Sequence, residues 1–282
     1  MIIDFHTHTF PDKIADAAVK KLAEKSHTTP FLDGTAGQLR DAARAASIHR
    51  SIVLPVATSA RQVEHINDFA ARTNEHTEET GLLSFGCMHP DYPSWREEMG
   101  RMKEMGLKGI KLHPVYQGVD IDDVRFLRIL ERAGELGLIV VTHAGWDIGF
   151  PGEAHCSPEM TLRAIKAVGP VKLVLAHMGG WQQWDRVLEL LADQPVWLDT
   201  SFSTGALTPL QEGDPFLKDF SMLDEEGFLR MVKAFGTDRL LFGTDSPWSR
   251  QKESIDWIRA LPLSEEEKAA ILGGNARKLL GI

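Results

Sequence analysis

The sequence predicts an α/β protein, specifically a closed (β/α)8 TIM barrel, from three observations. Short β-branched apolar runs alternate with helical segments along the whole chain, as in parallel sheets covered by helices on both faces. The runs number eight, and α/β barrels of about 250 residues form single domains. Most runs end in a side chain that binds metals or carries protons, and the ends of barrel strands converge on one face. We therefore expect one domain over residues 1–282.

The eight predicted strands share a nearly continuous apolar character, which is typical of buried parallel strands. They are Ile2–His6, Ser51–Val56, Leu82–Met88, Gly109–His113, Leu138–His143, Val171–His177, Val196–Thr200 and Leu240–Thr244. An open, doubly wound sheet has similar local signals. The sequence has neither the glycine-rich fingerprint of dinucleotide binding nor a Gly-Lys-Ser/Thr phosphate loop, which favours the barrel.

The segments between the strands have helical periodicity and helix-ending residues. In Asp122–Leu136 the apolar residues recur at i, i+3 spacing, which we interpret as one buried helix face followed by a stop at Gly137. These apolar residues are Val124, Leu127, Leu130, Ala133 and Leu136. Ser157 before a proline, and Ser264 three residues before Glu267, have the spacing of helix N-caps.

The longest irregular connection is Ser201–Phe220, and the loops Thr9–Thr35 and Ala144–Cys156 are further candidates for the same role. Each is interpreted either as a lid or specificity segment over the catalytic face or as a static insertion.

Composition and charge exclude several classes of protein. With 43% apolar and 25% charged residues and no apolar stretch of about 20 residues, the chain is not expected to span a membrane. Its net charge of −9, without a basic stripe, excludes nucleic acid as a partner and leaves a small-molecule substrate. The two cysteines form no Cys-x-x-Cys pair and no signal-type segment precedes the first strand, so we expect a cytoplasmic protein. Cys87 is expected to be buried, and Cys156 to be a loop residue or a metal ligand.

The strongest chemical signal is a pair of histidines at the end of the first strand. Strand side chains alternate between faces, so His6 and His8 point to the same side and can meet one ion. His143 and His177 each end a later apolar run, and Asp245 follows the last one. A buried carboxylate costs several kcal/mol unless it is paired or bound to metal. Together these residues favour a metal centre over isolated core histidines.

These residues stand in motifs that resemble those of the amidohydrolase superfamily, in the branch that includes aminocarboxymuconate semialdehyde decarboxylase and related hydrolases. The motifs, in the family's order, are Asp4-x-His6-x-His8, Lys111-x-His113-Pro114, Thr142-His143-Ala144-Gly145, His177-Met178-Gly179-Gly180, Gly243-Thr244-Asp245-Ser246-Pro247 and a segment from Ile271 through Asn275 to Arg277. The resemblance covers essentially the whole chain and implies a TIM barrel of the metallo-dependent hydrolase type.

The resemblance also implies a ligand set. His6, His8, His143 and Asp245 would hold one divalent ion, expected to be Zn²⁺, with His177 beside the metal-bound water. Such a set with one open position is typical of catalytic zinc, which lowers the pKa of bound water to about 7. We expect His177 and Asp245 to carry protons in the reaction.

The fourth strand leaves an alternative open. Alternation puts Lys111 and His113 on one face. A carbamylated Lys111 would bridge two metal ions in a binuclear centre. Otherwise we expect Lys111 to pair with Asp4 or Asp199. His113, Lys111, His89 and His155 are the candidate substrate-binding residues, although His89 and His155 could also be ordinary loop residues.

For the reaction, we expect hydrolysis of a C–O or C–N bond in a small organic substrate by metal-activated water. The alternative is non-oxidative decarboxylation of an unsaturated or aromatic acid with the same metal shell. An arginine clamp such as Arg61 or Arg250 would suit an acid. A non-catalytic metal-binding protein ranks below both. The segment Trp181–Trp184 could support a homodimer interface or belong to the core.

Overall fold

The computed structural model describes all 282 residues, and the chain divides into two compact units. Residues 1–53 and 199–282 form the first, here called the terminal unit, and residues 54–198 form the second, here called the central unit. The prediction of a single domain stays a prediction. No helix combines the length and the apolar character needed to cross a membrane.

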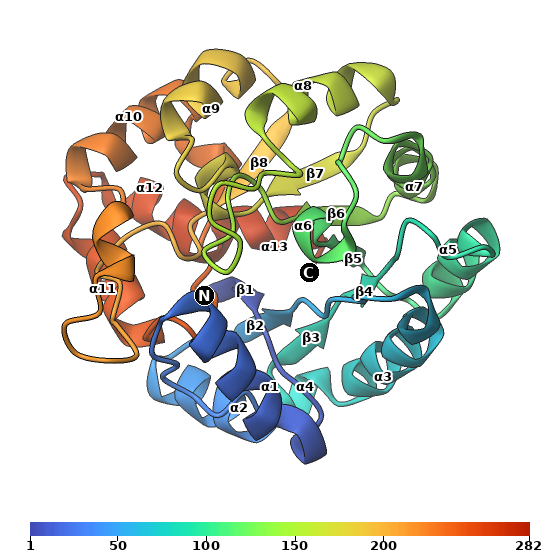
Figure 1. Cartoon of the computed structure of the whole chain (residues 1–282), viewed down its shortest axis with the longest axis horizontal. Helices are drawn as coiled ribbons and strands as arrows, with labels where there is room; N and C mark the ends of the chain where they lie inside the picture. The colour runs from blue at the N-terminus through green and yellow to red at the C-terminus, as the bar shows by residue number, and fades with distance from the viewer. The chain divides into compact units, whose positions relative to one another are not determined.

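The terminal unit joins the first strand of the chain to its last. Strand β1 (Ile3–Thr7) pairs in parallel with β2 (Arg50–Val53), with Asp4 opposite Ser51. On its other side, the Phe5 amide donates to the Phe242 carbonyl just after β9 (Leu240–Leu241), at 2.7 Å. The helices of this unit are α1 (Asp12–Ser26), α2 (Ala36–Ala45), α10 (Glu225–Phe235), α11 (Gln251–Ala260), α12 (Glu265–Ala269) and α13 (Asn275–Leu280), blue and orange to red in Figure 1.

The central unit contains a run of parallel strands in regular register. They are β4 (Gly86–Cys87), β5 (Gly109–Leu112), β6 (Ile139–Thr142), β7 (Lys172–Leu175) and β8 (Val196–Asp199), the last residue of which belongs to the terminal unit. Leu112 lies opposite Thr142, Thr142 opposite Leu175, and Leu175 opposite Leu198. Because the strands are in step, the residues that follow them emerge at one edge of the sheet.

The helices of the central unit lie between these strands in the sequence, which gives the alternation that parallel pairing requires. They are α3 (Val63–Glu75), α4 (Thr77–Thr80), α5 (Trp95–Glu104), α6 (Pro114–Gln117), α7 (Val124–Leu136), α8 (Pro158–Ala167) and α9 (Trp184–Leu191). A short strand, β3 (Leu82–Ser84), precedes β4 (Figure 1). The core consists of apolar residues of these strands and of the helix faces that cover them.

All eight predicted runs contain strand, but the bounds differ. The run Leu82–Met88 is divided into β3 and β4, and β2 ends at Val53 rather than Val56. His113 and His143 follow the last residues of β5 and β6 instead of ending them. Because these two residues lie just outside the strand ladder, their backbone is not held in strand geometry, and their side chains need not follow the alternation of the strand.

The helix interpretation was partly wrong for α7. Its buried residues are Phe126, Ile129, Leu130 and Ala133, whereas Val124 is 73% exposed. A strict i+3 series drifts by about 60° at each step of a 3.6-residue helix, so the predicted set could not stay on one face. The stop at Gly137 is confirmed by its left-handed backbone, and Ser157 and Ser264 are N-caps as predicted.

Both cysteines are buried and unpaired with each other. The Cys156 thiol lies 3.4 Å from the Thr161 hydroxyl in the core of the central unit. Trp181 is also buried, at 2% exposure, and belongs to the core, whereas Trp184 is half-buried. A homodimer interface at this segment stays a prediction.

Candidate metal centre

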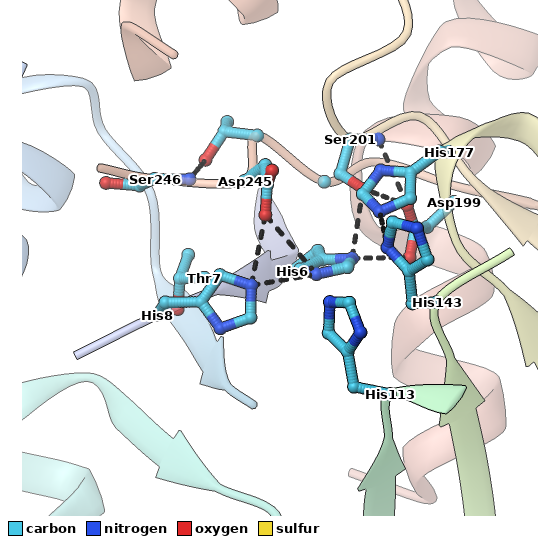
Figure 2. Close-up of polar contacts among 12 residues, drawn as sticks. His6, Thr7, His8, His113, His143, His177, Asp199, Ser201, Asp245 and Ser246 are labelled. Carbon is cyan, nitrogen blue, oxygen red and sulfur yellow. Dashed lines mark hydrogen bonds and ion pairs between the residues drawn. The ribbon is translucent and has the colours of Figure 1, made fainter. Parts of the chain in front are cut away.

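Two histidines and one carboxylate converge in the terminal unit. His6 Nε2 lies 3.2 Å from His8 Nε2 and 3.4 Å from Asp245 Oδ1, and His8 Nε2 lies 3.0 Å from the same oxygen (Figure 2). Two ligands 2.0–2.1 Å from one tetrahedral zinc are about 3.4 Å apart. The spacing of this triad, His6, His8 and Asp245, therefore fits a shared divalent ion, as does its nitrogen and oxygen chemistry.

A second carboxylate orients His6. Asp199, at the end of β8, accepts a hydrogen bond from His6 Nδ1 at 2.8 Å, and the Ser201 hydroxyl lies 2.9 Å from the same nitrogen. Ser201 also donates to Asp199 through both its hydroxyl and its amide. Because a carboxylate only accepts hydrogen bonds, His6 carries its proton on Nδ1. The lone pair of its Nε2 then faces His8 and Asp245. Asp199 thus fixes the tautomer and the ring orientation of His6, as carboxylates commonly do for histidines that bind metals.

Asp245 is held in an uncommon backbone conformation. Its φ of 62° is left-handed, and its amide donates to the His6 carbonyl at 2.8 Å. Such backbone is costly for a residue with a Cβ and clusters at functional sites. Gly243, two residues earlier, allows this segment to approach β1 closely, since a Cβ at residue 243 would lie 2.8 Å from the His6 Cβ. The local sequence Gly-Thr-Asp therefore fits the turn that brings Asp245 to the histidines.

A separate histidine cluster lies in the central unit. His143 Nδ1 is 3.0 Å from His177 Nε2, and His143 Nε2 is 3.0 Å from the Trp146 carbonyl (Figure 2). A carbonyl only accepts, so His143 carries its proton on Nε2 and offers the lone pair of Nδ1. His177, like Asp245, has a left-handed backbone, with φ of 58°.

His113 stacks on His143 in the same cluster. Their rings are 4.3 Å apart and inclined by 13°, and Asp147 Oδ2 lies 3.6 Å from His113 Nε2 and 3.9 Å from His143 Nε2. Three potential donors are close together here. An ion binds in the plane of an imidazole, however, and two stacked parallel rings cannot both point at one ion. We therefore assign Asp147 as a neighbour that orients the two histidines and not as a metal ligand.

Helix α6 and the loop after β6 place two aromatic rings near His113. The Tyr116 ring contacts His113 edge-on at 4.4 Å and Phe150 at 5.2 Å. Asp147 Oδ1 accepts from the Gly149 amide at 2.7 Å, which shapes the turn that carries Phe150. The half-buried Tyr116 and Phe150 thus form an aromatic patch next to the histidines.

The other predicted residues have local partners. His89 is buried and accepts from the Asp91 amide at 3.1 Å, and burial lowers its pKa. His155 lies 2.6 Å from Asp120 in an outer loop. Lys111 is 1% exposed in β5. Substrate binding by these residues and by His113 stays a prediction, as does carbamylation of Lys111 or its pairing with Asp4 or Asp199.

Sequence reasoning missed two site residues. Asp147 lies in an irregular loop without a periodic signal. Asp199 was considered only as a partner for Lys111, although a carboxylate at the end of a buried strand needs a partner and His6 supplies one. Of the two arginines considered as a clamp, Arg250 is exposed, with its guanidinium over the Phe31 ring at 4.3 Å, and Arg61 is also exposed.

Comparison with known proteins identifies a family model over almost the whole chain and curated relatives over parts of it. A family model described as amidohydrolase matches residues 3–282. Among curated proteins, the chain is 27% identical over 203 residues to 2-amino-3-carboxymuconate-6-semialdehyde decarboxylase of Dictyostelium discoideum, covering 64% of this chain and 55% of that protein. It is 24% identical over 142 residues to gamma-resorcylate decarboxylase of a Polaromonas species, covering 48% and 41%. The matched segment thus spans about half the length of these relatives.

Solved structures with the same fold cover the chain almost completely. An uncharacterized TIM-barrel protein from Bordetella bronchiseptica matches with a TM-score of 0.73 at 18% identity, covering 99% of this chain and 98% of that one. 5-Carboxyvanillate decarboxylase from Sphingomonas paucimobilis matches with a TM-score of 0.65 at 16% identity, covering 100% and 99%. The fold is therefore a TIM barrel, as predicted. A dihydroxybenzoic acid decarboxylase from Polaromonas with a TM-score of 0.66, at 16% identity and covering 99% and 96%, was solved with bound manganese.

These relatives correct the predicted reaction. Both curated proteins are decarboxylases, and so are several of the structural neighbours. The expectation of C–O or C–N hydrolysis was wrong, because the candidate metal ligands on which it rested do not by themselves specify the reaction. The findings agree with the alternative that the sequence left open.

Proposed function

Because the chain belongs to the amidohydrolase family, we propose that it is a metal-dependent, non-oxidative decarboxylase of a small unsaturated or aromatic acid. The observation that carries the proposal is the triad of His6, His8 and Asp245 in a chain whose curated relatives are named as decarboxylases of a muconate and of a resorcylate. Both names denote acids in which the carboxylate is attached to an unsaturated or aromatic carbon framework.

The triad would hold the divalent ion. Its two imidazoles and one carboxylate suit either zinc, which the sequence suggests, or manganese, which the Polaromonas relative binds. A bound divalent ion supplies positive charge that draws electrons from a substrate oxygen. That His143 is a further metal ligand stays a prediction. Its coordinating atom would be Nδ1, which carries the lone pair.

The remaining side chains would transfer protons and select the shape of the substrate. Decarboxylation breaks the bond between the carboxylate and its carbon, CO₂ leaves, and that carbon keeps the electron pair and takes up a proton. We assign this proton transfer to His177, whose Nε2 is held 3.0 Å from His143 Nδ1. A proton-carrying role of Asp245 stays a prediction. The aromatic patch of Tyr116 and Phe150 beside His113 suits a flat, unsaturated substrate.

The test is turnover by protein loaded with Zn²⁺ or Mn²⁺ on a panel of hydroxybenzoic acids, unsaturated dicarboxylic acids, lactones and amides. We expect release of CO₂ from one of the acids and a product in which a solvent deuteron replaces the carboxylate. His177→Asn should retain the ion and lose most of this activity. Hydrolysis of a lactone or amide without CO₂ release would contradict the proposal. Metal binding without any turnover would favour a non-catalytic metal-binding protein.

A further inference from the structure

A third carboxylate, Asp4, lies close in sequence to the two histidines of the triad. Asp4 and His6 are both in β1 and His8 directly follows this strand, but Asp4 is completely buried. Its two oxygens accept hydrogen bonds from the Thr244 amide at 2.9 Å, the Thr244 hydroxyl at 2.6 Å, the Gln251 side-chain amide at 3.3 Å and the His6 amide at 3.4 Å. With its oxygens occupied in this way, Asp4 is not a metal ligand.

The hydrogen bonds of Asp4 surround the turn that carries Asp245. Thr244 precedes Asp245, and its hydroxyl both donates to Asp4 and accepts from the amide of Ser246, which follows Asp245, at 3.1 Å. The Asp245 amide is itself bound to the His6 carbonyl. The backbone on both sides of the left-handed Asp245 is therefore tied to β1, directly or through Thr244.

We infer that Asp4 is a positioning residue for the triad, which fixes the turn at residues 244–246 against β1 and thereby aims the Asp245 carboxylate at His6 and His8. The left-handed backbone of Asp245 is costly and persists only while its surroundings impose it. Four donor groups converge on the buried Asp4 carboxyl, two of them from Thr244, and leaving such buried groups unpaired is costly, so this network can impose the turn. This inference rests on the function proposed above.

The test compares the Zn²⁺ affinity of wild type with that of Asp4→Ala and Asp4→Asn, measured against a chelator of known affinity. Loss of an outer partner of metal ligands typically lowers metal affinity 10- to 100-fold, and we expect about this loss for Asp4→Ala. Asp4→Asn should recover most of it. Its side-chain oxygen can still accept from the Thr244 amide, and the buried Gln251 Oε1, which has no hydrogen-bond partner, can accept from the new amide after the Gln251 side chain turns.

Thr244→Val provides a second variant that leaves Asp4 intact. It removes the hydroxyl that links Asp4 to the Ser246 amide, and we expect weaker Zn²⁺ binding here too. The visible spectrum of the Co²⁺-loaded protein supplies an independent readout, since a misdirected Asp245 alters the d–d bands in both variants. Either variant therefore tests the inference if the other folds poorly.

Glu98→Ala is the matched control. Glu98 is a buried carboxylate of the central unit that accepts from Asn67 at 2.7 Å and from Arg101, so its loss should lower the unfolding temperature without changing Zn²⁺ affinity. If folded Asp4→Ala behaves like Glu98→Ala, with a lower unfolding temperature and unchanged affinity and Co²⁺ spectrum, Asp4 is merely structural and the inference is overturned while the triad stands. If wild type itself binds no Zn²⁺, Co²⁺ or Mn²⁺, the proposed metal centre falls and the inference with it.

Discussion

At the scale of single residues, the coordinating nitrogen of His6 depends on a carboxylate outside the triad. The hydrogen bond to Asp199 holds the proton on Nδ1, so that the lone pair of Nε2 can bind the ion. Asp199→Asn keeps the size of the side chain but removes its charge, so the tautomer and basicity of His6 are less well defined. We expect about a tenfold loss of Zn²⁺ affinity, measured by chelator competition.

The control for this prediction is Asp193→Asn, the same chemical change at an exposed position six residues earlier in the chain. It should leave the affinity at the wild-type level. Equal affinities for Asp199→Asn and Asp193→Asn would show that Asp199 does not support the ligand.

The two cysteines allow a prediction about pH. Burial raises the pKa of Cys156 to about 11 and also raises the pKa of Cys87. Alkylating reagents attack the thiolate, so the native protein should react with iodoacetamide very slowly at pH 8 and faster as the pH rises toward 11. Mass spectrometry should find both thiols labelled only after unfolding in guanidinium. Rapid labelling of native Cys156 at pH 8 would contradict its assignment as a closed core residue.

At the scale of elements, two of the long connections are fastened to each other. The Thr29 amide donates to the Thr208 carbonyl, and the Leu210 amide to the His27 carbonyl, each at 2.9 Å. His27 Nδ1 also lies 2.7 Å from Asp214 and its ring stacks on Phe216 at 4.1 Å. Within the terminal unit, residues 27–29 and 208–216 thus behave as one connected surface segment, which favours a fixed insertion over a freely moving lid.

This connection should depend on pH. The hydrogen bond from His27 lowers the pKa of Asp214 below its ordinary value of 3.8. A carboxylate with a depressed folded-state pKa stabilises above the unfolded pKa, and the stabilisation is lost as the pH falls through the folded value. Hydrogen exchange of the Leu210 amide, corrected for its intrinsic rate, should be faster in Asp214→Asn than in wild type at pH 7, and this difference should shrink as the pH falls below 3.8. Equal protection at pH 7 would show that the pair does not fasten the loop.

Much of this element structure follows from the sequence, and the misses have physical causes. Apolar runs locate all eight strand regions, because burial on both faces of a parallel sheet requires such runs. Strand ends were less predictable, since hydrogen bonding and not composition decides where the ladder stops, as at Val53 and Thr142. The face of α7 was misassigned because a strict i+3 spacing does not follow the helical period.

The candidate site was predictable only in part. His6 and His8 were found because two residues on one strand share a face, and the structure places Asp245 with them. Asp147 and the role of Asp199 depend on where loops and distant strands meet, which no local pattern specifies. The reaction was mispredicted because the metal ligands do not distinguish attack on a bond by water from loss of CO₂.

At the scale of the whole molecule, the triad joins opposite ends of the chain. His6 comes from the first strand, His8 directly follows it, and Asp245 follows the last one. Backbone hydrogen bonds already connect these segments, with the His8 amide 2.7 Å from the Ser246 carbonyl. An ion bound by all three side chains would act as a further link between residues nearly 240 positions apart in sequence, and it would be lost on unfolding.

Removal of this ion should therefore destabilise the fold and not only abolish activity. A ligand at 100 times its Kd stabilises the native state by about 2.7 kcal/mol, which corresponds to a Tm shift of roughly 5–10 °C for a domain of about this size. We expect a chelator to lower the Tm of the Zn²⁺-loaded wild type by this amount, measured by calorimetry. His6→Ala, which lacks a triad ligand, should have a Tm that the chelator does not change. If the chelator lowers both melting temperatures equally, the ion that stabilises the protein is bound elsewhere.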